Sequence, residues 1–194
     1  MRQVPQATAA KLMVAADVIA DRGLDNTKIE DLASATGIPK ATLYYYFEGK
    51  EQILSYIFGV VLDAVGAAVA EGVAGKGTAA KRLERVIECH LKVFEKYPKA
   101  SQALQFDLGR AARRPELATR IRSSYVDPVS ELLAEGASDG SLRHVENARL
   151  TAVAVLGATS TAAIHVLAID PIASFKSLSK VIVPFVLQGL RSGT

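Results

Sequence analysis

Several residue types are scarce in this chain of 194 residues, which has no tryptophan, one cysteine and three histidines. The single cysteine, Cys89, excludes an intramolecular disulfide and suits a reducing compartment. Because Cys89 falls within an apolar helical pattern, we expect it to be buried and unreactive. The histidines, His90, His144 and His165, are far apart in the sequence. Cys/His metal spacings, glycine-rich phosphate loops and nucleophile elbows are also absent, so we expect no metal, no cofactor and no enzyme, unless distant residues converge in the fold.

An excess of charge of one sign is missing as well, because the net charge is only +3. Residues 1–50 carry six Lys/Arg and six Asp/Glu, and residues 51–194 carry 17 and 14. Bulk charge therefore does not support nucleic-acid binding. Any such function has to depend on individually placed side chains.

Targeting and membrane segments are not indicated. The N-terminus has neither an uninterrupted apolar stretch nor a cleavage pattern, so we expect no signal peptide. Residues 150–169 contain no Asp, Glu, Lys or Arg, which approaches the length of a membrane span. Their many Ala, Thr, Ser and Gly residues, together with His165, make them weakly hydrophobic. We expect no membrane span and a cytoplasmic location.

The fold is predicted to be all-α, with about nine helices. Apolar residues make up 49% of the chain, and its β-branched residues are scattered rather than alternating. Gly72, Gly75 and Gly77 indicate a linker. We place the domains at 1–50 and 51–194. Helices are expected over 8–22, from about 49 onward, and over 78–96, 98–113, 115–137, 146–169 and 172–190.

Residues 27–50, TKIEDLASATGIPKATLYYYFEGK, predict a helix, a sharp turn and a second short helix. Thr27 and Glu30 have the spacing of a capping box, which starts a helix. Gly37 suits a left-handed C-terminal cap, and Pro39 suits a helix start. The apolar face of the first helix is formed by Ile29, Leu32 and Ala33. Two short helices at a glycine turn describe a helix-turn-helix, whose second helix enters a DNA major groove.

The faces of the second helix follow from the helical repeat of 100° per residue. Leu43 and Phe47 share the inner face, and Tyr46 lies close to it. Outward and flanking positions belong to Ala41, Tyr45, Thr42 and Tyr44. A small residue and an aromatic suit base edges and thymine methyls, and hydroxyls suit phosphates. The alternative is a solvated three-helix module whose tyrosines only cover the core.

Two lysines are placed at helix starts, Lys40 in the second helix and Lys50 in the next. The positive charge of a lysine and the N-terminal end of a helix dipole both favour a phosphate group. We therefore expect both lysines to lie close to phosphate groups of the DNA.

Residues 11–58 resemble the DNA-binding domain of the TetR family of bacterial transcriptional regulators. The resemblance depends on a series of residues in matching order: Asp21-Arg22-Gly23, Thr27, Ile29-x-x-Leu32-Ala33, Gly37-Ile38, Thr42-Leu43-Tyr44-Tyr45-x-Phe47 and Lys50-Glu51. It implies an N-terminal three-helix helix-turn-helix domain and a C-terminal helical domain for ligand binding and dimerisation.

Site residues are implied by the same resemblance. The positions that mostly grip the DNA backbone are Thr27, Lys28, Tyr44, Tyr46 and Lys50. Those that lie at the groove are Pro39, Lys40, Ala41, Thr42 and Tyr45. The chain departs from the family at Pro39, usually serine or threonine, at Tyr46, often histidine, and at Ala41, commonly glycine. These departures leave the operator sequence open.

A homodimer interface is expected on the last two helices. One stripe of mostly small residues consists of Ala152, Leu156, Thr159, Ala163 and Val166. A second, apolar stripe consists of Ile182, Phe185, Val186 and Leu190. The resemblance implies that these helices pair with their copies in a four-helix bundle, and the alternative is a core within one chain. A dimer would present two reading helices to a palindromic operator.

A pocket for a small-molecule effector is also implied by the resemblance. Candidate lining residues are polar or aromatic groups that interrupt apolar helix faces: His90, Phe94, Gln105, Phe106, Tyr125 and His165. Arg110, Arg113 and Arg114 could bind an acidic ligand, but a helix C-terminus favours arginine in any case. The sequence does not identify the effector.

The expected function is a ligand-responsive transcriptional regulator. The resemblance favours a repressor that effector binding releases from its operator, and the sequence itself does not decide between repression and activation. The partners are then double-stranded DNA, a small molecule and a second copy of the chain. The alternative is a helical protein-interaction module that does not bind DNA.

Overall fold

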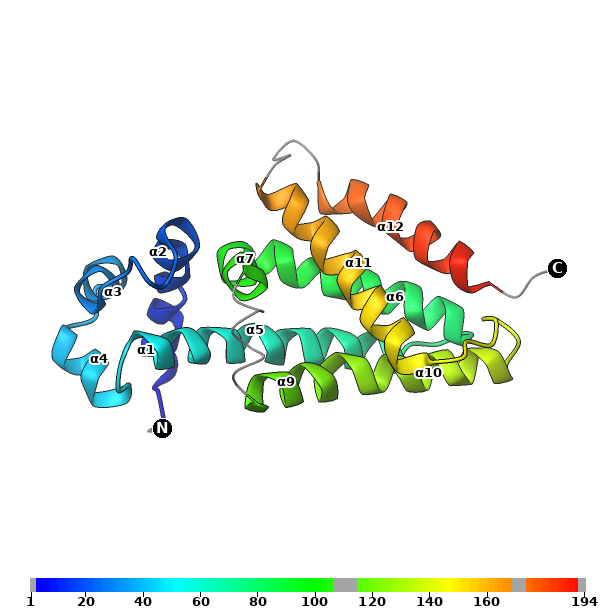
Figure 1. The fold of residues 1–194 in the computed structure, drawn as a ribbon, viewed down its shortest axis with the longest axis horizontal. Coiled ribbons are helices and arrows are strands. Elements are labelled where there is room, and N and C mark those ends of the chain that lie inside the picture. The colour runs from blue at the N-terminus through cyan, green and yellow to red at the C-terminus, as the bar shows by residue number, and fades with distance from the viewer. Residues whose placement is uncertain (1–2, 107–114, 169–173, 192–194) are drawn as a thin grey trace. The chain divides into compact units, whose positions relative to one another are not determined.

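The computed structural model describes residues 3–106, 115–168 and 174–191. These residues form helices without any strand (Figure 1), which confirms the all-α prediction. The described residues within 1–61 and 99–108 form one compact unit, and those within 62–98 and 109–194 form a second. Helix α5 (Lys50–Val73) contributes residues to both units. The domain boundary expected after residue 50 remains a prediction.

The first unit contains α1 (Gln6–Leu12), α2 (Ala15–Arg22), α3 (Ile29–Thr36), α4 (Lys40–Tyr46) and most of α7 (Pro98–Phe106). A single helix was predicted over residues 8–22, and this is wrong at Met13 and Val14. There the chain tightens into hydrogen bonds between residues three apart, such as Val14 N–H to the Lys11 carbonyl at 3.1 Å. The residues expected to point inward are nevertheless buried: Leu12, Ala15, Ala16 and Ile19.

The second unit is built around α6 (Ala79–Lys96), which packs against α10 (Asp127–Ser138), α11 (Ala148–Ala168) and α12 (Phe175–Leu190) (Figure 1). The remaining elements are α9 (Pro115–Ile121) and η1 (Arg122–Val126). If α1–α2 and α9–η1–α10 are each counted as one interrupted helix, the described residues form nine helices, as expected. Cys89 is buried in α6, as predicted, and burial raises the pKa of its thiol.

Gly72 was predicted to belong to a linker, but it lies in the last turn of α5. A Cβ atom at this position would come within 2.6 Å of Val86 Cγ2 and 2.7 Å of the Val86 backbone. Glycine therefore allows α5 and α6 to approach closely here. The actual connection follows Val73 and ends at Thr78, the N-cap of α6.

The two expected dimer stripes are largely buried inside a single chain. Ala152, Thr159, Ala163 and Val166 of α11 and Ile182, Val186 and Leu190 of α12 are all buried. These side chains form part of the core of the second unit, where α11 packs on α6 and α12. The assignment of these residues to a dimer interface was wrong. Two stripe residues are exceptions, because Leu156 is half-buried and 69% of Phe185 is exposed.

Two helices, α5 and α11, are long and apolar enough to cross a membrane by length and composition alone. Core helices of water-soluble proteins meet the same criteria. Within the most apolar window of each helix, 56% of the residues of α5 and 33% of those of α11 are buried. The expected absence of a membrane span remains a prediction.

Candidate DNA-binding surface and effector site

The turn between α3 and α4 is held by local hydrogen bonds. Gly37 adopts the left-handed conformation, with φ 64° and ψ 20°, and ends α3 as predicted. The Thr36 hydroxyl donates to the Leu32 carbonyl at 2.7 Å and accepts from the Ile38 N–H at 3.3 Å. Ile38 is buried beyond the turn. These contacts fix the direction in which α4 leaves α3.

The start of α3 differs from the prediction by one residue. Its N-cap is Lys28, whose N–H donates to the Asp31 carboxylate at 2.8 Å. The Thr27 hydroxyl instead donates to the Gly23 carbonyl at 2.7 Å, and Thr27 is fully buried. The predicted capping box of Thr27 and Glu30 is therefore wrong. Thr27 closes the turn after α2, and its hydroxyl is not available to a DNA phosphate.

The two faces of α4 agree with the helical repeat. Leu43 and Phe47 are buried, as expected for the inner face. Tyr44 and Tyr45 are 52% and 58% exposed, and Ala41 is also exposed. Thr42 and Tyr46 are half-buried at the flanks. The Tyr46 ring packs edge-on against Tyr45, with 4.9 Å between the ring centroids, which restricts the orientation of the Tyr45 side chain.

Lys40, at the start of α4, pairs with Glu30 of α3 through a hydrogen-bonded ion pair. The Lys40 ammonium lowers the pKa of the Glu30 carboxyl, and it also lies 5.8 Å from the centre of the Tyr44 ring. Both charged groups are exposed, so the pair contributes little to folding stability. Its effect is to balance the positive charge beside the outer face of α4. Lys28 and Pro39 are exposed nearby in the chain.

Lys50 is placed differently from the sequence prediction. Its ammonium group donates to the carbonyl oxygens of Leu24 at 2.8 Å, Asp25 at 3.2 Å and Thr27 at 2.9 Å. An ammonium group has three hydrogen-bond donors, and these three contacts use all of them. Lys50 thus joins the first turn of α5 to the loop between α2 and α3. The predicted phosphate contact would require at least one of these bonds to be lost.

In the second unit, three buried polar side chains from different helices converge: His90 of α6, Tyr125 of η1 and Thr159 of α11. The rings of His90 and Tyr125 are 5.1 Å apart, and Phe94 packs on His90 with 5.3 Å between ring centroids. His90 Nδ1, the Tyr125 hydroxyl and Thr159 Oγ1 have no hydrogen-bond partner among the described residues. We call these three residues the buried polar cluster.

Burial fixes the protonation state of this cluster. It lowers the pKa of His90 to about 4, because the imidazolium ion would lose its hydration. It raises the pKa of Tyr125 strongly. The Thr159 hydroxyl lies close enough to lower this pKa in part, although the two hydroxyl groups do not meet the distance and angle of a hydrogen bond. All three side chains are therefore neutral near pH 7.

Tyr125 lies in a π-helical turn that the sequence did not predict. Residues 115–137 were expected to form one α-helix, but η1 separates α9 from α10. At its end the Asp127 N–H donates to the Arg122 carbonyl, five residues earlier. Such turns are rare and occur frequently at functional sites.

The structure brings together three of the six predicted effector residues, His90, Phe94 and Tyr125. His165 is exposed on α11, which argues against its predicted role. Gln105 is a half-buried residue of the first unit. The side chain of Phe106 and the residues Arg110, Arg113 and Arg114 lie outside the described part of the chain. Thr159, which the sequence placed in a dimer stripe, joins the cluster instead.

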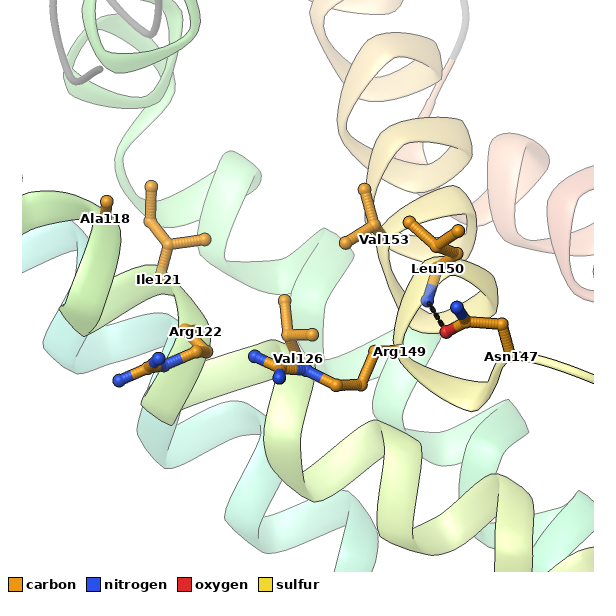
Figure 2. A pocket seen from close by; sticks show the side chains of 8 residues that line it. All are labelled: Ala118, Ile121, Arg122, Val126, Asn147, Arg149, Leu150 and Val153. Carbon is orange, nitrogen blue, oxygen red and sulfur yellow. Dashed lines mark hydrogen bonds between the residues drawn. The ribbon is translucent and has the colours of Figure 1, made fainter.

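An open pocket of about 470 Å³ lies between the α9–η1 segment and α11 (Figure 2). Its lining residues are Ala118, Ile121, Arg122, Val126, Asn147, Arg149, Leu150 and Val153. The guanidinium groups of Arg122 and Arg149 each come within 3.9 Å of the Asp127 carboxylate. None of these residues was predicted from the sequence. Exposed apolar residues one turn apart, such as Leu150 and Val153, resemble ordinary core residues until the packing is known.

Comparison with protein families identifies both parts of the chain. Residues 12–57 match the family described as bacterial regulatory proteins, tetR family. Residues 76–164 match the family described as the tetracyclin repressor-like C-terminal domain.

Individual proteins agree with this assignment. The chain is similar to the fatty acid metabolism regulator protein of Bacillus subtilis, with 24% identity over 74% of each chain. It is also similar to the HTH-type transcriptional repressor KstR2 of Mycolicibacterium smegmatis, with 29% identity over 68% of this chain and 65% of the relative.

A solved structure shows the same fold. The crystal structure of the transcriptional regulator FadR from Bacillus subtilis in complex with stearoyl-CoA superposes with a TM-score of 0.75 and 22% identity, covering 93% of this chain and 98% of that one. The helix-turn-helix geometry of α3 and α4 and the two family matches lead to one conclusion. The chain belongs to the tetR family of bacterial regulatory proteins, and it is a ligand-responsive, DNA-binding transcriptional repressor.

Proposed function

We propose that this chain binds a palindromic operator as a homodimer and releases it when a small effector binds to the second unit. Regulators of the tetR family bind DNA operators, typically as dimers, and respond to small molecules. The main support is the outer face of α4, where Ala41, Tyr44 and Tyr45 are exposed on a short helix held by the Gly37 turn.

The set of DNA-contacting residues that we propose is smaller than the set expected from the sequence. Ala41, Thr42 and Tyr45 read base edges in the groove, with Pro39 and Lys40 at the entrance. Lys28, Tyr44 and Tyr46 contact the DNA backbone. Thr27 and Lys50 are left out, because their polar groups are engaged within the first unit.

The Glu30–Lys40 ion pair affects how the operator is bound. A phosphate that approaches Lys40 competes with the Glu30 carboxylate for the same ammonium group. The exchange of one anion for another yields less net attraction than an unpaired lysine would give. Sequence-specific contacts from Tyr45 and its neighbours therefore supply a larger share of the binding free energy.

The homodimer is supported by exposed apolar side chains on the last two helices. On α12, Val181 and Phe185 are 66% and 69% exposed. Leu150 and Val153 of α11 are also exposed, but they line the open pocket of Figure 2, so the α12 residues carry this argument. Exposed apolar patches of this kind mark interaction sites, and a symmetric pair of copies would cover them. This surface replaces the buried stripes that the sequence suggested.

The release mechanism depends on a difference in effector affinity between two states of the dimer. Helix α5 contains residues of both units, so a change in its tilt alters the spacing of the two α4 helices. An effector that binds the wrongly spaced state more tightly shifts the population away from DNA. The effector site that we propose is the buried polar cluster with Phe94. The protein acts on chromosomal DNA, so its proposed location is the cytoplasm.

The test is a DNA-binding assay on the DNA upstream of the gene for this chain. The purified chain should retard this DNA in a gel, and a footprint should show two equal halves related by two-fold symmetry. A folded, dimeric protein that retards no genomic fragment would contradict the proposal and favour the protein-interaction module. Tyr97→Ala is the control variant, because Tyr97 is a half-buried residue of the second unit, away from the helix-turn-helix. It should retard the DNA as the unmodified chain does.

A further inference from the structure

The buried polar cluster indicates the chemical class of the effector. We propose that the effector is a largely apolar molecule with one neutral carbonyl group, an ester, thioester or ketone, and that this carbonyl binds among His90, Tyr125 and Thr159. The inference rests on the proposed function, since it assumes that an effector binds in the second unit.

The first step of the argument is the unpaired polar atoms. His90 Nδ1, the Tyr125 hydroxyl and Thr159 Oγ1 are buried and have no hydrogen-bond partner among the described residues. Buried polar groups in proteins are nearly always hydrogen-bonded, and each exception requires an explanation. Here three exceptions from three different helices lie in one place. The Tyr125 and Thr159 hydroxyls are close to each other, but neither has a well-formed hydrogen bond, which a bound partner would supply.

The second step is the absence of charge in the cluster. His90 is neutral because burial lowers its pKa to about 4, and burial also keeps the Tyr125 hydroxyl protonated. Two hydroxyl groups can donate hydrogen bonds to a carbonyl oxygen. A carboxylate would lose its hydration here without a charged partner among these three residues, which is much more costly than the burial of a neutral carbonyl.

The third step is the apolar surroundings. The rings of Phe94 and Tyr125 both pack against the His90 ring, and all three side chains are buried. A site of this composition binds an apolar body through its walls and selects one polar group by hydrogen bonding. The π-helical turn brings Tyr125 close to His90 of α6 and to Thr159 of α11.

A different chemistry is offered by the open pocket of Figure 2, which is lined by apolar residues and by Arg122 and Arg149, each 3.9 Å from the Asp127 carboxylate. That pocket would favour a carboxylate or phosphate over a neutral carbonyl. The two sites therefore predict opposite preferences for otherwise identical molecules, which makes the experiment decisive.

The experiment compares neutral carbonyl compounds with acids of the same skeleton. The probes are straight-chain methyl esters and the corresponding carboxylates over a range of chain lengths, and a polycyclic ketone with a matched carboxylate. Binding to the full chain is measured by calorimetry at pH 7.5. At least one neutral compound should bind about ten-fold or more tightly than its acid, because burial of an unpaired carboxylate is costly. The same compound should release operator DNA in the gel assay.

Two conservative variants test the residues. Tyr125→Phe and Thr159→Val each remove one hydroxyl and keep the shape, and each should weaken binding of the neutral compound about ten-fold. The matched control is the double variant Arg122→Gln/Arg149→Gln, which should leave this binding unchanged. Circular dichroism and thermal unfolding confirm that every variant is folded. His90→Gln is a third variant if either hydroxyl variant fails to fold.

Several results would overturn the inference. These are a preference for the acids, binding that depends on the two arginines, equal binding by the hydroxyl variants, and no binding of any neutral compound, which would mean that the cluster holds buried water only. Failure of the proposed function is distinguishable, because the chain would then bind no operator DNA even without a ligand.

Discussion

The candidate binding residues of the two units are arranged in opposite ways. In the first unit, Ala41, Tyr44 and Tyr45 project outward from one helix. In the second unit, His90, Tyr125 and Thr159 are buried where three helices meet. An exposed face can contact a molecule as large as DNA without rearrangement, whereas an enclosed cluster can take only a small molecule and has to open first. The four predictions below test this contrast, from the largest expected effect to the smallest.

The largest effect is expected from the exposed apolar surface of α12. The double variant Val181→Asp/Phe185→Asp places two carboxylates on this surface and should prevent dimerisation. Operator affinity should then fall by more than about a hundred-fold, because one α4 helix contacts too few base pairs. Light scattering gives the oligomeric state, and a gel shift gives the affinity. Lys81→Asp, an exposed change on α6, is the control. A dimeric double variant would contradict the proposed surface.

The next prediction concerns the pH dependence of stability. Burial lowers the pKa of His90 from 6.5 to about 4, so the unfolded chain binds a proton at this residue before the folded chain does. The free energy of unfolding should therefore fall as the pH decreases from 6.5 towards 4, by about 3 kcal/mol in total. Urea unfolding across this pH range measures the change. In His90→Leu this part of the pH dependence should disappear. If His90→Leu and the unmodified chain gave the same pH profile of stability, His90 would be solvated in the folded chain.

Tyr45 should matter for specificity more than for general affinity. In Tyr45→Ala the operator affinity should fall by about 1–3 kcal/mol, and the preference for operator over unrelated DNA should relax. Folding should be unaffected, because 58% of Tyr45 is exposed. Binding to the operator and to single-base variants of it is measured in parallel. An unchanged footprint would refute a reading role for Tyr45.

The smallest expected effect is a difference between Lys50 and Lys28 in the salt dependence of DNA binding. Lys50→Met removes three hydrogen bonds to carbonyls, so it should lower thermal stability and operator affinity without a change in the salt dependence of binding. Lys28→Met should reduce the slope of log affinity against log salt concentration by about one, as expected for one phosphate contact. A reduced slope in Lys50→Met would instead support the phosphate contact that was predicted from the sequence.

Helix positions and the two faces of α4 could be predicted from the sequence because they depend on local signals. Leu43 and Phe47 are four residues apart and are buried together, and Gly37 ends α3 where its conformational freedom is needed. Such features require no knowledge of distant residues.

Other features were missed because they depend on tertiary contacts. Thr27 follows the general pattern of a helix cap, but its hydroxyl bonds backward to Gly23. Thr159 fits a stripe of small residues, but α11 packs against α6 and η1, and Thr159 is buried in the core. The ammonium of Lys50 finds carbonyls more than twenty residues earlier in the chain. No periodic pattern contains this information.

The ion pair between Glu30 and Lys40 has a consequence for how the protein searches a chromosome. Attraction to unrelated DNA comes almost entirely from unpaired lysines and arginines. Under the proposed function, Glu30 offsets the charge of Lys40, so this side of α4 should attract unrelated DNA less strongly than an unpaired lysine would.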